Sequence, residues 1–235
     1  MLKFLFKAIL IALFLFGGWK IRFYFILALA FFLWLSHWKP KFDEAAFHLY
    51  FGLPGCGKTT ALAYMFFRFQ KMHKFDLFSN VQLKGAYKLD RSDFGVFDLH
   101  VDYDKSICFV DEASVYYFKR DFAKFSTKEN SFHSQHRKHH VMECFFCQTW
   151  DGIDQRLREL NSHLYYVYNK NYPVIGKVIF IREIMKAFDI YTGDPKDSYQ
   201  FKPFSTRWFL GRSVFRKFNT YEVEKLPDKQ WIQFN

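Results

Sequence analysis

One stretch decides the fold of this chain: Gly52-Leu53-Pro54-Gly55-Cys56-Gly57-Lys58-Thr59, which has the spacing G-x-x-x-x-G-K-[ST]. An apolar run with β character, residues 46–51, precedes it, and residues 60–65 continue it as a helix. The glycines let successive backbone N–H groups turn around a phosphate, and the helix points the positive end of its dipole at the same anion. Lys58 is expected to reach the β- and γ-phosphates, and Thr59 to offer its hydroxyl to Mg²⁺. The sequence therefore predicts an ATP- and Mg²⁺-binding loop formed by Gly52, Pro54, Gly55, Cys56, Gly57, Lys58, Thr59 and Thr60.

A second segment supplies the carboxylates that such a loop needs. Residues 106–112 read Ser-Ile-Cys-Phe-Val-Asp-Glu, and four apolar residues in a row are typical of a parallel strand buried on both faces. Asp111, at the end of that strand, is expected to hold the Mg²⁺ shell. Glu112 is placed to polarise a water for attack on the γ-phosphate. The Asp-Glu pair favours hydrolysis over phosphoryl transfer to a small molecule.

Further strands and a helix complete an α/β pattern. Residues 75–83, 141–147 and 163–168 are predicted strands, and Asp151 to Asn161 is a predicted helix with Asp151 as its N-cap. Their alternation indicates a mostly parallel sheet with helices on its faces. Gln148 follows the strand expected beside the carboxylate strand, so it is a candidate for sensing the γ-phosphate or the attacking water.

Arginines near that strand are candidates for a role on a neighbouring subunit. Arg137 lies in a basic segment before the strand. Arg158 points away from the apolar stripe of the predicted helix. Arg156 flanks that stripe and is expected to pair locally, for example with Asp111. A trans-acting arginine compensates charge in the transition state. Arg137 and Arg158 are therefore predicted to complete the catalytic set of Lys58, Glu112 and Gln148.

Histidines and cysteines cluster in the same region: His133, His136, His139, His140, Cys144 and Cys147. A zinc site is disfavoured, because two cysteines three apart in a strand point to opposite faces. The alternative is a basic segment that presents its histidines and arginine to an anion, either a neighbouring subunit's nucleotide or a DNA backbone.

Composition narrows the class of protein. Aromatic residues make up 23% of the 235 residues and apolar residues 50%, which excludes disorder over most of the chain. Four cysteines within apolar runs indicate a reducing compartment and not a disulfide scaffold. The net charge of +11 implies an anionic partner, either nucleic acid or a membrane surface.

The first forty residues have the character of a membrane segment. From Phe4 to Trp38 the only charges are Lys7, Lys20 and Arg22. Three membrane interpretations compete: a helical hairpin with both ends in the cytoplasm, one span plus an interfacial helix, and a cleaved signal peptide; a buried core helix is the fourth possibility. We expect residues 1–40 to be an N-terminal transmembrane helix or helical hairpin, residues 41–170 the ATPase domain, and residues 171–235 a basic, aromatic extension.

Cations alternate with aromatic residues in that extension. Between Tyr199 and Tyr221 stand Lys202, Arg207, Arg212, Arg216 and Lys217 among phenylalanines and a tryptophan. This composition suits single-stranded DNA, an anionic membrane surface, or packing against the ATPase core.

Taken in order, these motifs resemble the filamentous-phage assembly ATPases, also called the zonula-occludens-toxin (Zot) family. The resemblance covers roughly residues 45–170. It depends on GLPGCGKT at 52–59, SNVQL at 79–83, FVDEA at 109–113 and, most specifically, His136-Arg137, His139, Gln148, Ile153-Asp154 and Leu157-Arg158. The loop and the carboxylate strand are common to all P-loop ATPases of the additional-strand type.

The resemblance implies an oligomeric ATPase, expected to be a ring, in the host inner membrane with its ATPase domain in the cytoplasm. Such proteins drive export of single-stranded phage DNA during virion assembly and extrusion, which implies DNA or a phage nucleoprotein and other phage assembly proteins as partners. Familiar members place a single span after the ATPase domain, whereas the apolar segment here comes first, so their topology does not carry over. The alternative is a non-motor membrane protein whose nucleotide site recruits partners. The Asp111-Glu112 pair argues against this alternative.

Overall fold

The computed structural model describes residues 18–36, 39–44, 46–95, 99–117, 126–185 and 200–215. The chain divides into two compact units, Met1–Trp38 and Lys39–Asn235, each described below by itself. The first unit contains helix α2 (Trp19–Ser36). The second contains β1 (Phe47–Phe51), α3 (Lys58–Gln70), β2 (Asp76–Ser79), β3 (Tyr87–Lys88), the 3-10 turn η1 (Arg91–Asp93), β4 (Ser106–Val110), α4 (Ala113–Tyr116), α5 (Thr127–Gln135), β5 (Val141–Cys147), α6 (Gln155–Leu160), β6 (His163–Tyr172), β7 (Gly176–Met185), β8 (Gln200–Phe201), β9 (Arg207–Leu210) and α7 (Arg212–Phe215).

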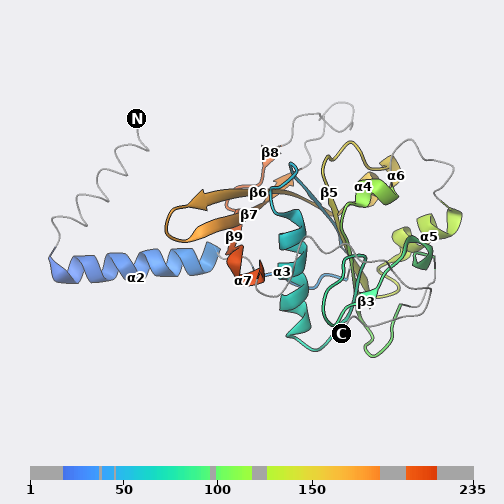
Figure 1. Cartoon of the computed structure of the whole chain (residues 1–235), viewed down its shortest axis with the longest axis horizontal. Helices are drawn as coiled ribbons and strands as arrows, with labels where there is room; N and C mark the ends of the chain where they lie inside the picture. The colour runs from blue at the N-terminus through green and yellow to red at the C-terminus, as the bar shows by residue number, and fades with distance from the viewer. Residues whose placement is uncertain are drawn as a thin grey trace. The chain divides into compact units, whose positions relative to one another are not determined.

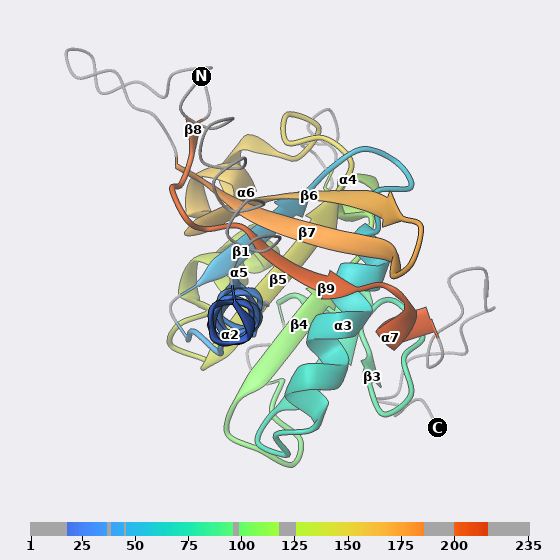
Figure 2. The same ribbon diagram turned by 90° about the vertical axis from the view of Figure 1, so that its left-hand side faces the viewer.

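The strands form one nine-stranded sheet in the order β3-β2-β4-β5-β1-β6-β7-β8, with β9 paired to β7. The pairs from β3 to β6 are parallel, and β7, β8 and β9 join antiparallel. Strand β5 lies between the loop strand β1 and the carboxylate strand β4 (Figure 2). The prediction of a mostly parallel α/β sheet is confirmed, and the one strand between β1 and β4 agrees with the order expected for the additional-strand type.

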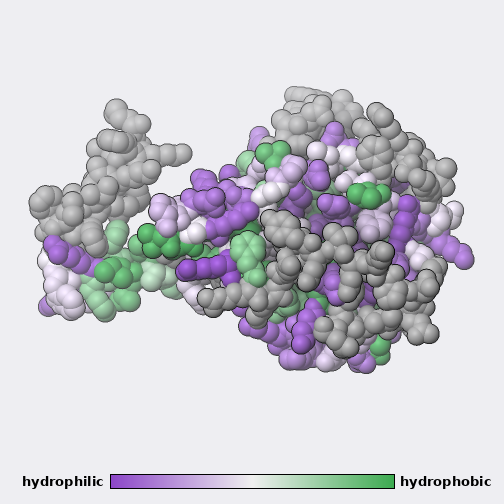
Figure 3. All heavy atoms as spheres, viewed as in Figure 1, coloured by the Kyte–Doolittle hydropathy of each residue, from purple (hydrophilic) through white to green (hydrophobic). Residues whose placement is uncertain are grey.

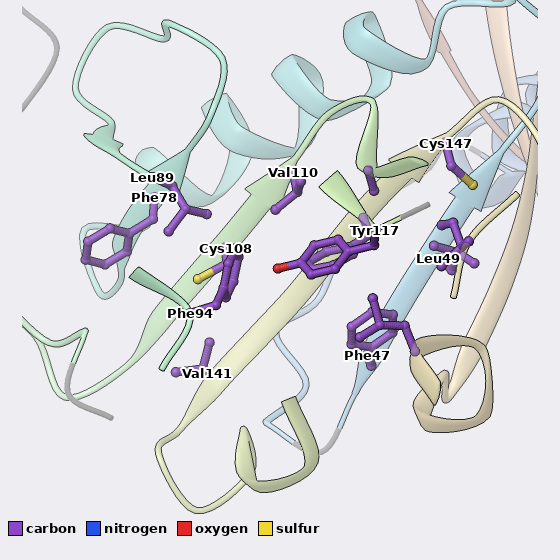
Figure 4. Packing of buried hydrophobic residues seen from close by; sticks show 14 of the residues in the cluster. Phe47, Leu49, Phe78, Leu89, Phe94, Cys108, Val110, Tyr117, Val141 and Cys147 are labelled. Atoms are coloured by element: carbon purple, nitrogen blue, oxygen red, sulfur yellow. The ribbon is translucent and has the colours of Figure 1, made fainter. Parts of the chain in front are cut away.

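Helices cover both faces of the central strands (Figure 1). On one face α3 packs Phe66 and Phe69 against Phe109 of β4, with ring centroids 6.0 Å and 6.4 Å apart. On the other face, residues of α4, α5 and α6 close over β1, β4 and β5, and the Tyr117 ring lies stacked on Phe145 in this core (Figure 4). Burial of this aromatic core on both sides holds the carboxyl ends of β1, β4 and β5 together at one edge.

Two predicted elements differ in length from the observed ones. The strand predicted over 75–83 is β2, only Asp76–Ser79, because the Ser79 hydroxyl accepts a hydrogen bond from Val81 N at 3.1 Å and the chain turns there. The predicted helix 151–161 is α6, Gln155–Leu160; its N-cap is Asp154, whose carboxylate accepts a hydrogen bond from Arg156 N. Residues 151–153 form the preceding turn, so the prediction of Asp151 as N-cap is wrong.

The predicted boundary at residue 170 falls inside strand β6 (His163–Tyr172). Strands β6 and β7 form a long antiparallel hairpin, and β9 pairs with β7 from Val178 to Ile181. Figure 2 shows β6, β7 and β9 side by side. The chain beyond residue 170 therefore continues the central sheet as far as it is described; residues 186–199 and 216–235 lie outside the described residues.

Helix α2 carries two charged residues, Lys20 and Arg22, near its start, and residues 23–35 are all apolar or aromatic. Figure 3 shows hydrophobic side chains along its visible side, and its exposed large apolar residues are Trp19, Phe23, Tyr24, Ile26, Leu27, Leu29, Phe31 and Trp34. Within the described part of the chain, no helix combines the length and the apolar character that a membrane span requires. Residues 1–17, which hold most of the first predicted span, lie outside the described residues.

Candidate functional site

The loop between β1 and α3 needs its glycines for two physical reasons. Gly55 and Gly57 have φ of 71° and 100°, a left-handed conformation that side chains disfavour. A Cβ on Gly57 would also lie 2.8 Å from Ile179 Cδ1, and one on Gly52 would lie 2.3 Å from the Val167 carbonyl oxygen. The loop therefore packs tightly against the hairpin of β6 and β7, and larger residues at these positions would displace it.

Lys58 begins α3 and reaches back across the loop. Its ammonium donates hydrogen bonds to the Gly52 carbonyl at 2.8 Å and the Leu53 carbonyl at 3.0 Å. The side chain is buried. The positive charge is therefore held against the loop backbone, where a bound phosphate group would need it.

Thr59 connects the loop to the carboxylate strand. Its hydroxyl donates a hydrogen bond of 2.6 Å to Asp111 Oδ2. Asp111 is buried, and this burial raises the pKa of its carboxyl group, against the opposing effect of the Thr59 bond. A hydroxyl oxygen and a carboxylate oxygen side by side are ligands that Mg²⁺ accepts together with substrate phosphates. The residues present thus fit a Mg²⁺ site at this point.

Asn80 fixes the carboxylate strand from its neighbour β2, a role the sequence did not suggest. Its side-chain amide donates to the Asp111 carbonyl at 2.9 Å, and its side-chain oxygen accepts from Asp111 N at 2.8 Å. These two bonds hold the backbone of Asp111 in place. The signal for this role in the sequence was a polar residue, Asn80, at the carboxyl end of a strand parallel to β4. The carboxyl ends of parallel strands meet at one edge of the sheet.

Glu112 and Gln148 lie at the same edge. Glu112 has φ of 48°, unusual for a residue with a side chain, and its N–H donates to Asp111 Oδ1 at 3.0 Å. Its side chain is exposed. Gln148 follows the last residue of β5, also exposed, between the ends of β1 and β4. The edge thus carries a hydroxyl, two carboxylates, an amide and an ammonium around one loop.

The fold is that of a P-loop NTPase.

Comparison with known proteins finds no protein-family model and no curated protein that matches the chain. Among solved structures, it is similar to the N-terminal domain of zonular occludens toxin from Neisseria meningitidis, with 16% identity, 74% of this chain and 99% of that chain covered, and a TM-score of 0.49. It is also similar to the genome packaging NTPase of Sulfolobus turreted icosahedral virus 2 with bound ATP-γS, at 11% identity, 68% and 98% coverage and a TM-score of 0.44.

A third similar structure is the flagellar accessory protein FlaH from Methanocaldococcus jannaschii, with 8% identity, 71% and 98% coverage and a TM-score of 0.40. The toxin domain bears the name of the family that the motifs resemble. At these identities a likeness concerns the fold alone, and the P-loop NTPase fold is assigned here from strand order and loop geometry.

The three arginines lie in different surroundings. Arg137 is exposed in the turn before β5, at the sheet edge opposite the loop. Arg158 is half-buried on α6, with its guanidinium 5.7 Å from the Trp150 ring centroid. Arg156 pairs locally with Asp154, at 3.1 Å. Arg137 and Arg158 thus stand on different elements, the turn before β5 and helix α6.

The histidine segment contains a buried hydrogen-bonded pair that the sequence did not suggest. His133 Nδ1 lies 2.6 Å from Glu143 Oε2, and both side chains are fully buried. His136 is also buried, so these two histidines are not presented to an external anion as expected. Among the described residues, no three His, Cys, Asp or Glu side chains gather as a metal site requires. The signal was Glu143 itself, because a carboxylate inside a buried strand needs a partner.

The hairpin also holds the tip of the nucleotide loop. Asn169 Nδ2 and Lys177 Nζ donate to the Gly55 carbonyl at 3.0 Å and 3.1 Å. Since a hydrogen bond contributes about 1 kcal/mol, Asn169→Ala and Lys177→Ala are each expected to weaken binding of a fluorescent ATP analogue about fivefold. Asn171→Ala, two residues further along the same strand, is the control and should bind as the wild type does. Undiminished binding in both loop variants would contradict this role.

Proposed function

We propose that this chain is a Mg²⁺-dependent ATP hydrolase that works as a membrane-anchored homo-oligomer, expected to be a ring. In this proposal it drives export of single-stranded phage DNA, or of a phage nucleoprotein, together with other phage assembly proteins during virion assembly and extrusion. Its place is the host inner membrane, with the ATPase domain in the cytoplasm. Support for the partners and the location comes from the motif resemblance over residues 45–170.

The observation that carries the enzymatic part is the contact between Thr59 and Asp111, 2.6 Å, beside Lys58 and Glu112. The loop backbone and Lys58 would bind the phosphates of ATP. Thr59 and Asp111 would hold Mg²⁺, which supplies charge neutralisation at the phosphates when bound. Glu112 would accept the proton of the attacking water, and Gln148 would orient that water.

The oligomeric part of the proposal is supported by the motif resemblance over residues 45–170. The described side chains at the loop supply one cation, Lys58, with Lys177 held on the outer side of the loop at Gly55. An arginine from a neighbouring subunit, Arg158 or Arg137, would supply the remaining positive charge in the transition state.

The membrane part is supported by the apolar run of residues 4–38 and by the exposed apolar side chains of α2. An amphipathic surface helix would carry a polar face, whereas residues 23–35 of α2 are all apolar or aromatic. Lys39 and Lys41 follow the segment, as a positively charged cytoplasmic flank would.

Metal removal tests the proposed reaction directly. ATP hydrolysis by the full chain in detergent should stop on chelation and return with added Mg²⁺. Thr59→Ala should require about tenfold more Mg²⁺ for half-maximal rate, because one oxygen of the site is lost. Thr59→Ser keeps the hydroxyl and serves as the matched control. Hydrolysis that persists in chelator, or a Thr59→Ala variant with the Mg²⁺ requirement of the wild type, would refute the proposed site.

A further inference from the structure

One face of the outer sheet is aromatic, cationic and partly open. Strand alternation and the pairing of Tyr168 with Phe180, Tyr166 with Arg182 and Phe180 with Trp208 place these side chains on one face of β6, β7 and β9. Phe201 of β8 joins the same face, because it pairs with Ile184. We call this set the aromatic platform: Tyr166, Tyr168, Phe180, Arg182, Phe201 and Trp208.

The rings of the platform form a continuous row. Ring centroids of Tyr168 and Phe180 are 5.1 Å apart with an interplanar angle of 11°, and those of Tyr166 and Tyr168 are 5.9 Å apart at 23°. Phe201 lies 6.1 Å from Tyr166. Such separations belong to offset arrangements, in which part of each ring face stays uncovered.

The row remains accessible although the same sheet face is closed elsewhere. Over β1, β4 and β5 this face is the sealed core, where Phe47 and Phe145 are 0% exposed. From β6 outward the cover ends: Tyr166, Tyr168, Phe180 and Trp208 are half-buried, and Phe201 is 41% exposed. Open aromatic area of this kind, next to a closed core, is what a stacking ligand needs.

The charge of the platform is positive. The Arg182 guanidinium lies 4.1 Å from the Phe201 ring centroid, and exposed Lys170 continues the row along β6. In the described parts of β6 to β9, this face carries no Asp or Glu: Glu183 points to the opposite face, where it pairs with His163 and Lys202. The complementary ligand is therefore an anion that also offers flat rings.

The platform reaches the nucleotide loop through β1. Phe51 packs on Tyr166, with ring centroids 5.4 Å apart, and the next residue is Gly52. The loop itself packs against the opposite face of the hairpin. There the Ile179 side chain lies beside Gly57, and Asn169 donates a hydrogen bond to the Gly55 carbonyl. One hairpin thus separates the platform from the ATP site by the thickness of a single sheet.

We propose that the aromatic platform binds single-stranded nucleic acid, with bases stacked on its rings and phosphates paired with Arg182 and Lys170. The proposal deepens the function above by giving its nucleic-acid partner a place on this chain, and it rests on that function. Cations interleaved with half-open rings match the way single strands are bound without sequence preference. An anionic membrane surface would share the charge but has no rings to stack, and this difference separates the two in solution.

The test is binding of a fluorescent oligothymidylate to the full chain in detergent, followed by anisotropy. Tyr168→Ala and Phe180→Ala should each weaken binding about tenfold, since one stacked base is lost. Tyr168→Phe keeps the ring and should bind as the wild type does. Tyr103→Ala removes a tyrosine that is 40% exposed on a loop outside the platform and is the matched control. Arg182→Gln should reduce the salt dependence of binding, because one phosphate contact disappears.

Basal ATP hydrolysis should stay unchanged in these variants, because no platform residue belongs to the proposed catalytic set. Equal oligonucleotide affinity of Tyr168→Ala, Phe180→Ala and Tyr103→Ala would overturn the proposal while leaving the ATPase assignment intact. Loss of affinity for phosphatidylglycerol vesicles but not for oligothymidylate would overturn it in favour of a membrane surface. Absence of Mg²⁺-dependent hydrolysis in the wild type would instead refute the proposed function.

Discussion

Glu112→Gln should lower kcat for ATP hydrolysis about 10²–10⁴-fold, the range that a positioned general base contributes. Glutamine has the shape of glutamate but does not take up the proton of the attacking water. The backbone at position 112 has φ of 48° and its N–H bonds Asp111 Oδ1 at 3.0 Å, neither of which the side-chain change alters. ATP affinity should therefore remain that of the wild type, because phosphate binding falls to the loop and Lys58.

The same experiment separates a motor from a nucleotide switch. Single-turnover hydrolysis measures the chemical step apart from binding and product release. Glu159→Gln, an exposed glutamate on α6 bonded to Gln155, is the matched control and should hydrolyse ATP normally. Lys58→Ala should lose both binding and turnover. A Glu112→Gln variant with wild-type single-turnover rate would remove Glu112 from the mechanism and favour the switch, since a switch needs no base.

The central strands were predictable because they are buried on both faces. Val141–Cys147 has the predicted limits, and the apolar run at 106–110 is strand β4. Every residue of both strands is buried, so mostly apolar runs mark them in sequence, with Glu143 as the exception inside β5. The loop at 52–59 was predictable for a different reason, because its glycine spacing reflects the backbone geometry of a phosphate-binding loop.

Long-range pairing was beyond the sequence. The residues of β6 do not indicate that this strand pairs antiparallel with the next one. The turn between Tyr172 and Gly176 resembles any surface turn in sequence. The two bonds between Asn80 and Asp111 join residues 31 positions apart. Two aspartates, Asp151 and Asp154, could have capped α6. Because Gly152 and Ile153 belong to the preceding turn, the helix begins after Asp154. Local patterns thus located strands and loop, whereas the contacts that position Asp111 and the Gly55 carbonyl came only from the three-dimensional arrangement.

The buried pair of His133 and Glu143 is expected to be the most sensitive point of the fold's stability. The atoms lie 2.6 Å apart, both side chains are fully buried, and Tyr117 OH lies 3.3 Å from His133 Nε2. Removing one partner costs about 3 kcal/mol, because the other side chain is left buried in the core without its hydrogen bond. His133→Leu or Glu143→Leu should therefore lower the Tm of the full chain in detergent by roughly 10 °C.

A double variant decides whether the pair itself carries this effect. Glu143 Oε1 has no hydrogen-bond partner among the described residues, so the pair is incompletely satisfied even in the wild type. Replacing both residues with leucine removes both buried polar groups and should be less destabilising than either single change. Glu44→Gln, which breaks the half-buried surface pair with Lys105, is the control and should shift Tm little, because surface pairs contribute about 0–1 kcal/mol. Additive losses in the double variant would show that His133 and Glu143 stabilise the core by packing alone. Recovery would show that β5 tolerates a carboxylate at its centre only because α5 places His133 against it.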